Sequence, residues 1–135
     1  MIPLLNSILL VDDDRANNFF HDYVIKHLHC AKFVVAKQYA SDALDYLKGD
    51  KHDWPELILL DINMPRMNGW EFLDAYRTID KERKSKTVIV MLTTSESPED
   101  RAKAHTIKEI NEYLIKPLDE EKLRALLRKY FEEKL

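Results

Sequence analysis

The chain has 135 residues, 45% hydrophobic and 33% charged, which is the size and balance of one globular domain. A formal net charge of −3 argues against sequence-independent nucleic-acid binding, and two glycines are too few for a glycine-rich phosphate loop. A single cysteine, no signal peptide and no apolar stretch long enough to cross a bilayer predict a cytoplasmic protein without a disulfide or membrane insertion.

Five short apolar runs predict the strands of a parallel sheet. The run between Leu57 and Leu60 is aliphatic and unbroken, which is typical of a strand buried on both faces. The five predicted strands are, in chain order, Ser7–Val11, Phe33–Ala36, Leu57–Leu60, Thr87–Leu92 and Ile110–Ile115.

Five segments with helical spacing alternate with these strands. In the first, Phe20, Val24 and Leu28 share one face and are expected to point inward. The expected N-terminal caps of the other four helices are, in chain order, Ser41, Asn68, Ser97 and Asp119. Polar connectors are expected at residues 51–56 and 81–86.

This alternation predicts an α/β fold with a five-stranded parallel sheet covered by helices on both faces. For a doubly wound sheet of five strands we expect the order 2-1-3-4-5, numbered along the chain. The last helix reaches almost to Leu135, so we expect residues 1–135 to form a single domain with no room for a second.

Polar side chains follow the strands where each one ends. Asp12 and Asp13 follow the first strand and Asp61 follows the third, while Thr93 and Lys116 end the fourth and fifth. In open sheets of this type, ligands bind beyond the carboxyl ends of the strands, where the strand order reverses. We therefore expect three carboxylates, a hydroxyl and an ammonium group to converge on one edge.

Three carboxylates in close proximity repel one another, and a divalent cation relieves that repulsion. Mg²⁺ fits because it prefers one or two carboxylates, keeps several waters and binds phosphate oxygens; Asp12 and Asp13 are the expected ligands, Asp12 through water. Asp61 could then attack phosphorus and form an acyl phosphate. Lys116 would neutralise phosphoryl oxygens, and the Thr93 hydroxyl would donate to one of them.

Four motifs resemble the receiver domain of two-component response regulators over nearly the whole chain. They are LLVDDD at Leu9–Asp14, LLDINMPRMNG at Leu59–Gly69, VMLTTS at Val90–Ser95 and YLIKP at Tyr113–Pro117. The resemblance implies a flavodoxin-like (βα)5 fold. It also implies a stand-alone, chemotaxis-type response regulator with no output domain, which catalyses only its own phosphorylation and dephosphorylation and is otherwise not an enzyme.

The resemblance also implies roles for individual residues. Asp61 would accept a phosphoryl group from a phosphohistidine of a sensor histidine kinase or a histidine phosphotransfer protein. Asp13 and Asp61 would bind Mg²⁺ through their side chains, and Asn63 through its backbone carbonyl. Thr93 and Tyr113 would form a switch pair in which the threonine moves toward the phosphoryl group and the tyrosine turns inward. The surface around the fourth helix, the fifth strand and the fifth helix would then change shape for a downstream protein.

One position departs from the pattern of the family. Thr94 stands where these proteins usually carry a very small residue, and its bulk beside the site is expected to affect transfer and hydrolysis rates.

Plainer interpretations of the same residues stay open at this point. The run Asp12–Asp14 could be a polar loop in which Asp14 caps a helix, and Asn63 could only stabilise a turn. Tyr113 could be a half-buried packing residue. A zinc site at His27, His29 and Cys30 is not expected, since residues two apart on a helix point to different faces.

Three other functions are compatible with a doubly wound fold. A phosphatase with an aspartyl nucleophile would need a general acid two residues beyond Asp61, and none stands there. A flavin-binding module would place its phosphate loop after the first strand, where aspartates repel phosphate. A receiver used only for docking would not need a full set of site residues.

Overall fold

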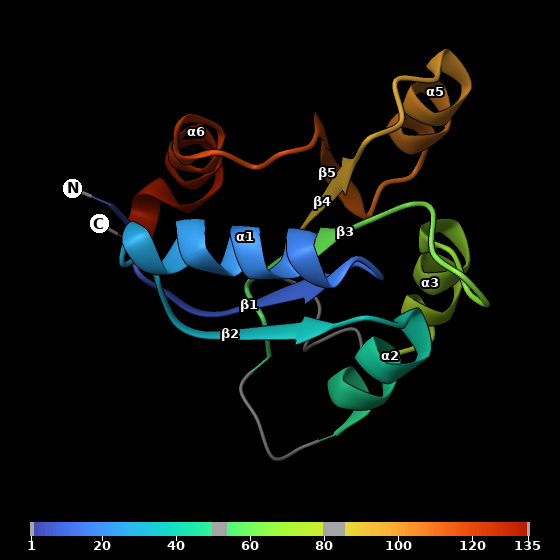
Figure 1. The fold of residues 1–135 in the computed structure, drawn as a ribbon, viewed down its shortest axis with the longest axis horizontal. Coiled ribbons are helices and arrows are strands. Elements are labelled where there is room, and N and C mark those ends of the chain that lie inside the picture. Colours follow the sequence, from blue (N-terminus) through green and yellow to red (C-terminus); the bar gives the residue numbers. More distant parts are fainter. Residues whose placement is uncertain (1, 50–53, 80–85, 135) are drawn as a thin grey trace.

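The five strands form one parallel sheet in the order β2-β1-β3-β4-β5, which confirms the predicted order (Figure 1). The computed structural model describes residues 2–49, 54–79 and 86–134, so most of the connectors expected at 51–56 and 81–86 lies outside the described residues. The strands are β1 (Leu5–Val11), β2 (Ala31–Lys37), β3 (Leu57–Leu60), β4 (Val88–Thr93) and β5 (Ile110–Ile115).

Helices cover both faces of the sheet. They are α1 (Arg15–His27), α2 (Ala40–Lys48), α3 (Gly69–Tyr76), α5 (Pro98–Thr106) and α6 (Glu120–Phe131), and the short 3-10 turn η1 (Glu132–Lys134) follows the last. Helices α1 and α6 lie over one face, and α2 and α3 lie over the other (Figure 1). In the part of the chain that the structure describes, no helix is long and apolar enough to span a bilayer.

The sheet separates two hydrophobic clusters, one under α1 and α6 and one under α2 and α3. Strand β3 lies in the middle of the sheet, and all four of its side chains are buried. Alternate residues of this strand enter opposite clusters, which explains why its sequence is aliphatic at every position rather than at every second one.

Side-chain caps set the start of most helices. Asn68 and Glu71 form a capping box at α3, and the predicted caps at Ser97 and Asp119 are confirmed. The prediction for Ser41 was wrong: the cap position of α2 is Tyr39, two residues earlier, and its side chain makes no capping hydrogen bond. Helix α2 is held instead by burial of its apolar face.

The buried face of α1 also differs from the prediction. Phe20 was expected to point inward, but its side chain is 42% exposed, while Val24 and Leu28 are buried. The helix is rotated so that Asn18 and His21 face the sheet together with Val24. Two polar residues therefore occupy positions that a hydrophobic pattern assigns to apolar ones.

Strand β5 carries one extra residue, Asn111. The pairing of β5 with β4 shifts at this position, and Asn111 Oδ1 accepts the backbone N–H of Ile89 at 2.9 Å. An extra residue reverses the alternation of side chains along a strand. As a result, Ile110 and Tyr113 pack on the same side of the sheet although they are three residues apart.

Helix α5 should be among the least stable elements of the fold. Its nine residues bury only Ala104, and local opening is easiest where few apolar contacts must break. We expect the backbone amides of α5 to exchange with solvent faster than those of α3, a helix of similar length, in hydrogen–deuterium exchange under native conditions. Protection of α5 equal to that of β3 would contradict this expectation. The control helix α3 buries Gly69, Phe72, Leu73 and Tyr76.

Candidate functional site

The register of the sheet places Asp12 beside Asp61. Val11 pairs with Leu60, and the backbone N–H of Asp61 donates to the carbonyl oxygen of Val11 at 3.0 Å. Asp12 and Asp61 therefore leave the neighbouring strands β1 and β3 at the same level. The ladder continues on the other side as well, where the N–H of Lys116 donates to Thr93 at 2.8 Å.

Lys116 lies between two carboxylates. Its Nζ is 2.5 Å from Asp12 Oδ2 and 3.4 Å from Asp61 Oδ2, and all three side chains are buried. Attraction between charges is stronger away from water, and each ion would be costly to bury alone. The lysine thus compensates part of the negative charge of the edge in this state.

Asp13 completes the acidic cluster from an exposed position. Carboxylate oxygens of Asp12, Asp13 and Asp61 all lie within 4.8 Å of one another. A set of hard oxygen donors open to solvent on one side suits Mg²⁺, which keeps part of its water shell. Among the described residues no other group of three metal-binding side chains occurs, so the residues around His27 form no such cluster.

The Asp61 carboxyl is held in a defined direction and is costly to ionise. Its Oδ1 accepts the backbone N–H of Ile62 at 2.8 Å, while Oδ2 faces Lys116. Burial raises the pKa of Asp61 above its ordinary value; Lys116 opposes this shift, and the charge of Asp12 adds to it. A cation at this edge would favour the ionised, nucleophilic form.

The loop after Asp61 folds back against it. A Cβ on Gly69 would collide with the carbonyl oxygen of Asp61, so this turn has no room for a side chain. Gly69 N–H also donates to the carbonyl of Ile62 at 2.8 Å. Asn63 lies exposed on the same loop, and its expected role as a backbone ligand stays a prediction.

Thr93 and Tyr113 meet at the loop that follows β4. Thr93 is fully buried, and its Oγ1 accepts the N–H of Ser95 at 3.2 Å. Tyr113 donates its hydroxyl to the carbonyl oxygen of Ser95 at 2.8 Å, and the guanidinium of Arg101 lies 4.9 Å from its ring centre. Thr94 itself is exposed. The two residues of the expected switch pair are thus connected through Ser95.

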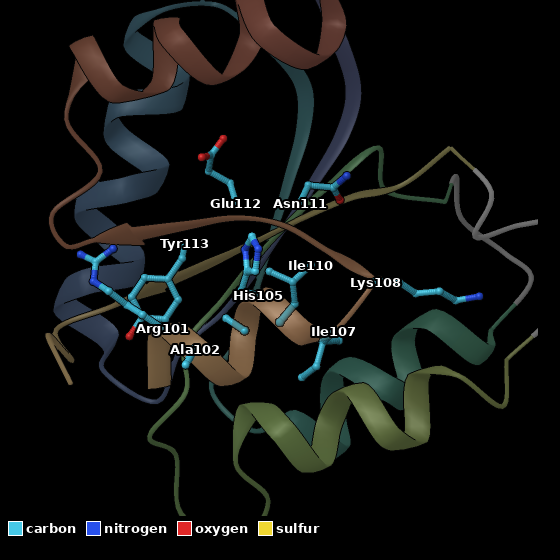
Figure 2. Close-up of a pocket in the computed structure, with 10 residues that line it drawn as sticks. Arg101, Ala102, His105, Ile107, Lys108, Ile110, Asn111, Glu112 and Tyr113 are labelled. Atoms are coloured by element: carbon cyan, nitrogen blue, oxygen red, sulfur yellow. The ribbon is translucent and has the colours of Figure 1, made fainter. Parts of the chain in front are cut away.

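An open groove of about 780 Å³ lies between α5 and β5 (Figure 2). Tyr113 and Arg101 close one end of it, and His105 lies between Tyr113 and Ile110. Glu112 points to the other side of β5, toward α6, where it pairs with Lys129 at 3.0 Å. The extra residue in β5 therefore puts the Tyr113 ring on the same side of the sheet as Ile110, at this groove.

Two buried residues beneath the site carry no signal in the sequence motifs. Asn18 Nδ2 donates to the carbonyl oxygen of Asp12 at 2.8 Å, and His21 Nε2 accepts the N–H of Leu118 at 3.1 Å. The only hint of them in the sequence is indirect: they are polar residues on the helical segment whose apolar residues Val24 and Ile25 pack inward. The pKa of His21 is lowered to about 4, mainly by burial and also by the charge of Lys116, while the charge of Asp12 acts in the opposite direction.

His21 should make the protein sensitive to acid. The pKa of His21 is about 4 in the folded chain, whereas an unperturbed histidine has a pKa of 6.5. Between these two pH values, the unfolded chain therefore binds a proton at His21 that the folded chain does not bind. The free energy of unfolding should therefore fall as the pH drops from 6.5 to 4, by about 3 kcal/mol from this group. Urea unfolding of the wild type and of His21→Gln, repeated across this pH range, measures how the free energy of unfolding depends on pH in each. The same pH dependence in both proteins would mean that His21 takes up its proton freely in the folded chain.

The fold and the acidic edge define a doubly wound α/β domain of the flavodoxin-like class, with its site at the carboxyl ends of β1 and β3. The family described as response regulator receiver domain matches residues 8–128. The chain is 33% identical to the probable methanogenesis regulatory protein FilR2 of Methanothrix harundinacea, over 87% of this chain and 76% of that protein. It is 32% identical to the transcriptional regulatory protein HprR of Escherichia coli, over 90% of this chain and 50% of that protein, so it spans half the length of HprR.

A solved structure agrees with these relatives. The two component response regulator from Cytophaga hutchinsonii superimposes with a TM-score of 0.84 at 32% identity and covers 96% of this chain and 98% of its own. The chain therefore belongs to the response regulator receiver domain family.

Proposed function

We propose that this chain is a phosphoacceptor switch in which Asp61 receives a phosphoryl group from a phosphohistidine. The observation that carries the proposal is the Lys116 ammonium between the buried carboxylates of Asp12 and Asp61 at the carboxyl edge of the sheet. Receiver domains are phosphorylated by sensor histidine kinases, so we propose a kinase or a histidine phosphotransfer protein as donor. We also propose that residues 1–135 act as one receiver domain; a cytoplasmic location stays a prediction.

In the proposed reaction, the free carboxylate oxygen of Asp61 attacks the phosphorus atom of the donor. The new P–O bond gives an acyl phosphate, and the P–N bond breaks with its electron pair going to the imidazole nitrogen of the donor histidine. Ile62 N–H fixes the other carboxylate oxygen, which leaves Oδ2 as the attacking atom. Alignment and charge neutralisation are most of what a protein must supply for this transfer.

We propose that Asp12, Asp13 and Asp61 hold Mg²⁺, with the backbone carbonyl of Asn63 as a further ligand. The three carboxylates supply the hard oxygen donors this ion prefers. When bound, the ion would neutralise phosphoryl oxygens. Lys116 would move its charge from Asp12 toward the transferred group, and Thr93 would donate its hydroxyl to a phosphoryl oxygen.

Thr93 and Tyr113 are proposed to report phosphorylation to the groove between α5 and β5. If Thr93 turns toward a phosphoryl group, its hydrogen bond with Ser95 breaks. The Ser95 carbonyl, which accepts the Tyr113 hydroxyl, would then shift. The Tyr113 ring would move with it, and the shape of the groove at that end would change. A downstream protein would bind this surface in one state and not in the other.

Incubation with Mg²⁺ and acetyl phosphate, followed by intact mass spectrometry, tests the proposal. We expect a single phosphoryl adduct that is stable in acid and labile in base, and that does not form when a chelator removes the metal. Continuous release of inorganic phosphate at enzyme-like rates would instead indicate a phosphatase. The exposed Asn63, where such an enzyme would carry its general acid, argues against that outcome.

A further inference from the structure

Helix α1 touches both loops that carry the charges of the site. Through Asn18 Nδ2 it holds the carbonyl oxygen of Asp12, at 2.8 Å. Through His21 Nε2 it accepts the backbone N–H of Leu118, at 3.1 Å and from 97 positions away in the sequence. Both side chains are buried, His21 with 2% of its surface exposed.

These two contacts lie on either side of one ion pair. Leu118 is two residues beyond Lys116, whose Nζ contacts Asp12 at 2.5 Å. A small cavity of about 10 Å³ is lined both by Asn18 and His21 of α1 and by Asp12 and Asp61 of the acidic edge. Helix α1 therefore supports the two loops of the site by hydrogen bonds to their backbone, and none of its side chains contacts the attacking oxygen of Asp61.

We propose that His21 is a positioning residue for phosphoryl transfer: its imidazole accepts the Leu118 N–H and so fixes the loop at 116–118 that carries Lys116. Asn18 fixes Asp12 in the same way from one turn earlier on the helix. The inference rests on the proposed function, since it concerns how Lys116 is held above Asp61. Neither residue touches the reacting atoms, so neither is a catalytic residue.

Lys122 also contacts this loop, but it bonds to carbonyl groups, so the acceptor of the Leu118 N–H is His21. Lys122 Nζ donates to the carbonyls of Ile115 and Pro117, at 2.8 and 3.1 Å, which satisfies acceptors on the α6 side. A buried N–H without an acceptor is costly, so the loop would shift to find one if the imidazole were removed. Because Lys116 is two residues away, a shift of about 1 Å would displace its ammonium from the acidic pair and slow the transfer.

A pair of amide substitutions isolates the role of the Nε2 atom. His21→Gln can place its Oε1 near the position of Nε2 and accept the Leu118 N–H, whereas His21→Asn is too short to reach it. Val24→Ala is the matched control: Val24 is buried on the same helix face, and its truncation lowers stability without removing a hydrogen bond to the loop. If His21→Asn does not fold, His21→Leu takes its place.

The rate of adduct formation with acetyl phosphate is the first measurement, at saturating Mg²⁺ and at a temperature where all variants are folded. We expect His21→Asn to lower the rate about tenfold or more, and His21→Gln and Val24→Ala to stay within about twofold of wild type. A wild-type rate in His21→Asn, or equal losses in His21→Asn and Val24→Ala, would overturn the inference.

Protection of the Leu118 amide in ¹⁵N NMR hydrogen exchange is the second measurement, and it needs no phosphorylation. We expect protection in wild type and His21→Gln, and its loss in His21→Asn but not in Val24→Ala. Unchanged protection in His21→Asn would refute the role of His21 whatever the rates are. A wild-type protein that shows this pattern but forms no adduct would refute the proposed function and leave the contact between His21 and the loop established.

Discussion

Asp61→Asn is expected to abolish the phosphoryl adduct formed with acetyl phosphate. The amide oxygen is a far weaker nucleophile than a carboxylate, and the substitution also removes one of the three negative charges of the acidic cluster. Intact mass spectrometry measures the loss directly. Asp45→Asn, which changes an exposed carboxylate on α2, should accept the phosphoryl group as the wild type does.

The same substitution should make the fold more stable at neutral pH. The pKa of Asp61 is raised in the folded chain, so from its ordinary value of 3.8 up to the raised one the folded chain binds more protons than the unfolded chain. The free energy of unfolding therefore falls as the pH rises through that window, and the loss persists at pH 7. Asp61→Asn removes this loss of stability, so the midpoint of thermal unfolding of the variant without Mg²⁺ should exceed that of the wild type. An adduct that persists in this variant would place the acceptor on another residue.

Lys116→Met is expected to move two properties in opposite directions. The rate of phosphoryl transfer should fall about 100-fold or more, as when one charge-stabilising donor is removed from a catalytic site. The affinity for Mg²⁺ should rise about tenfold, because the ammonium that now compensates Asp12 and Asp61 is gone and the carboxylates repel each other more strongly.

Calorimetric titration with Mg²⁺ and single-turnover transfer from acetyl phosphate measure the two effects. Lys48→Met, at the exposed end of α2, is the control for loss of a positive charge and should change neither. Weaker Mg²⁺ binding in Lys116→Met would mean that the lysine supports the metal site rather than competing with the ion for the two carboxylates.

The edge of the sheet could be predicted from the sequence because strand ends are local features. Unbroken aliphatic runs stop at Asp12 and Asp61, and a parallel sheet brings the carboxyl ends of its strands to one side. With the strand order fixed by doubly wound topology, the convergence of Thr93 and Lys116 on the same edge followed. The structure brings these residues together as expected, while their chemical roles stay predictions.

The rotation of α1 could not be read from its sequence. Spacing of Phe20, Val24 and Leu28 predicts one buried stripe, but the helix turns Asn18 and His21 to the sheet and leaves Phe20 largely exposed. A hydrophobic pattern predicts burial only for apolar side chains. A polar side chain can also be buried when it forms a hydrogen bond with a buried backbone group that would otherwise lack a partner. Similarly, Ser41 is a good cap in isolation, yet packing of α2 sets the start of that helix two residues earlier.

The five strands, their order and the residues at the acidic edge could all be predicted from local features of the chain, namely its hydrophobic runs and the alternation of strands and helices. Three contacts became visible only in the folded chain: His21 accepts the Leu118 N–H, Lys116 lies closer to Asp12 than to Asp61, and Tyr113 lies at the groove after the extra residue in β5. Each of these depends on how whole elements dock. A rotation of one helix or a shift of one strand by a single residue would change every such contact without altering the local pattern.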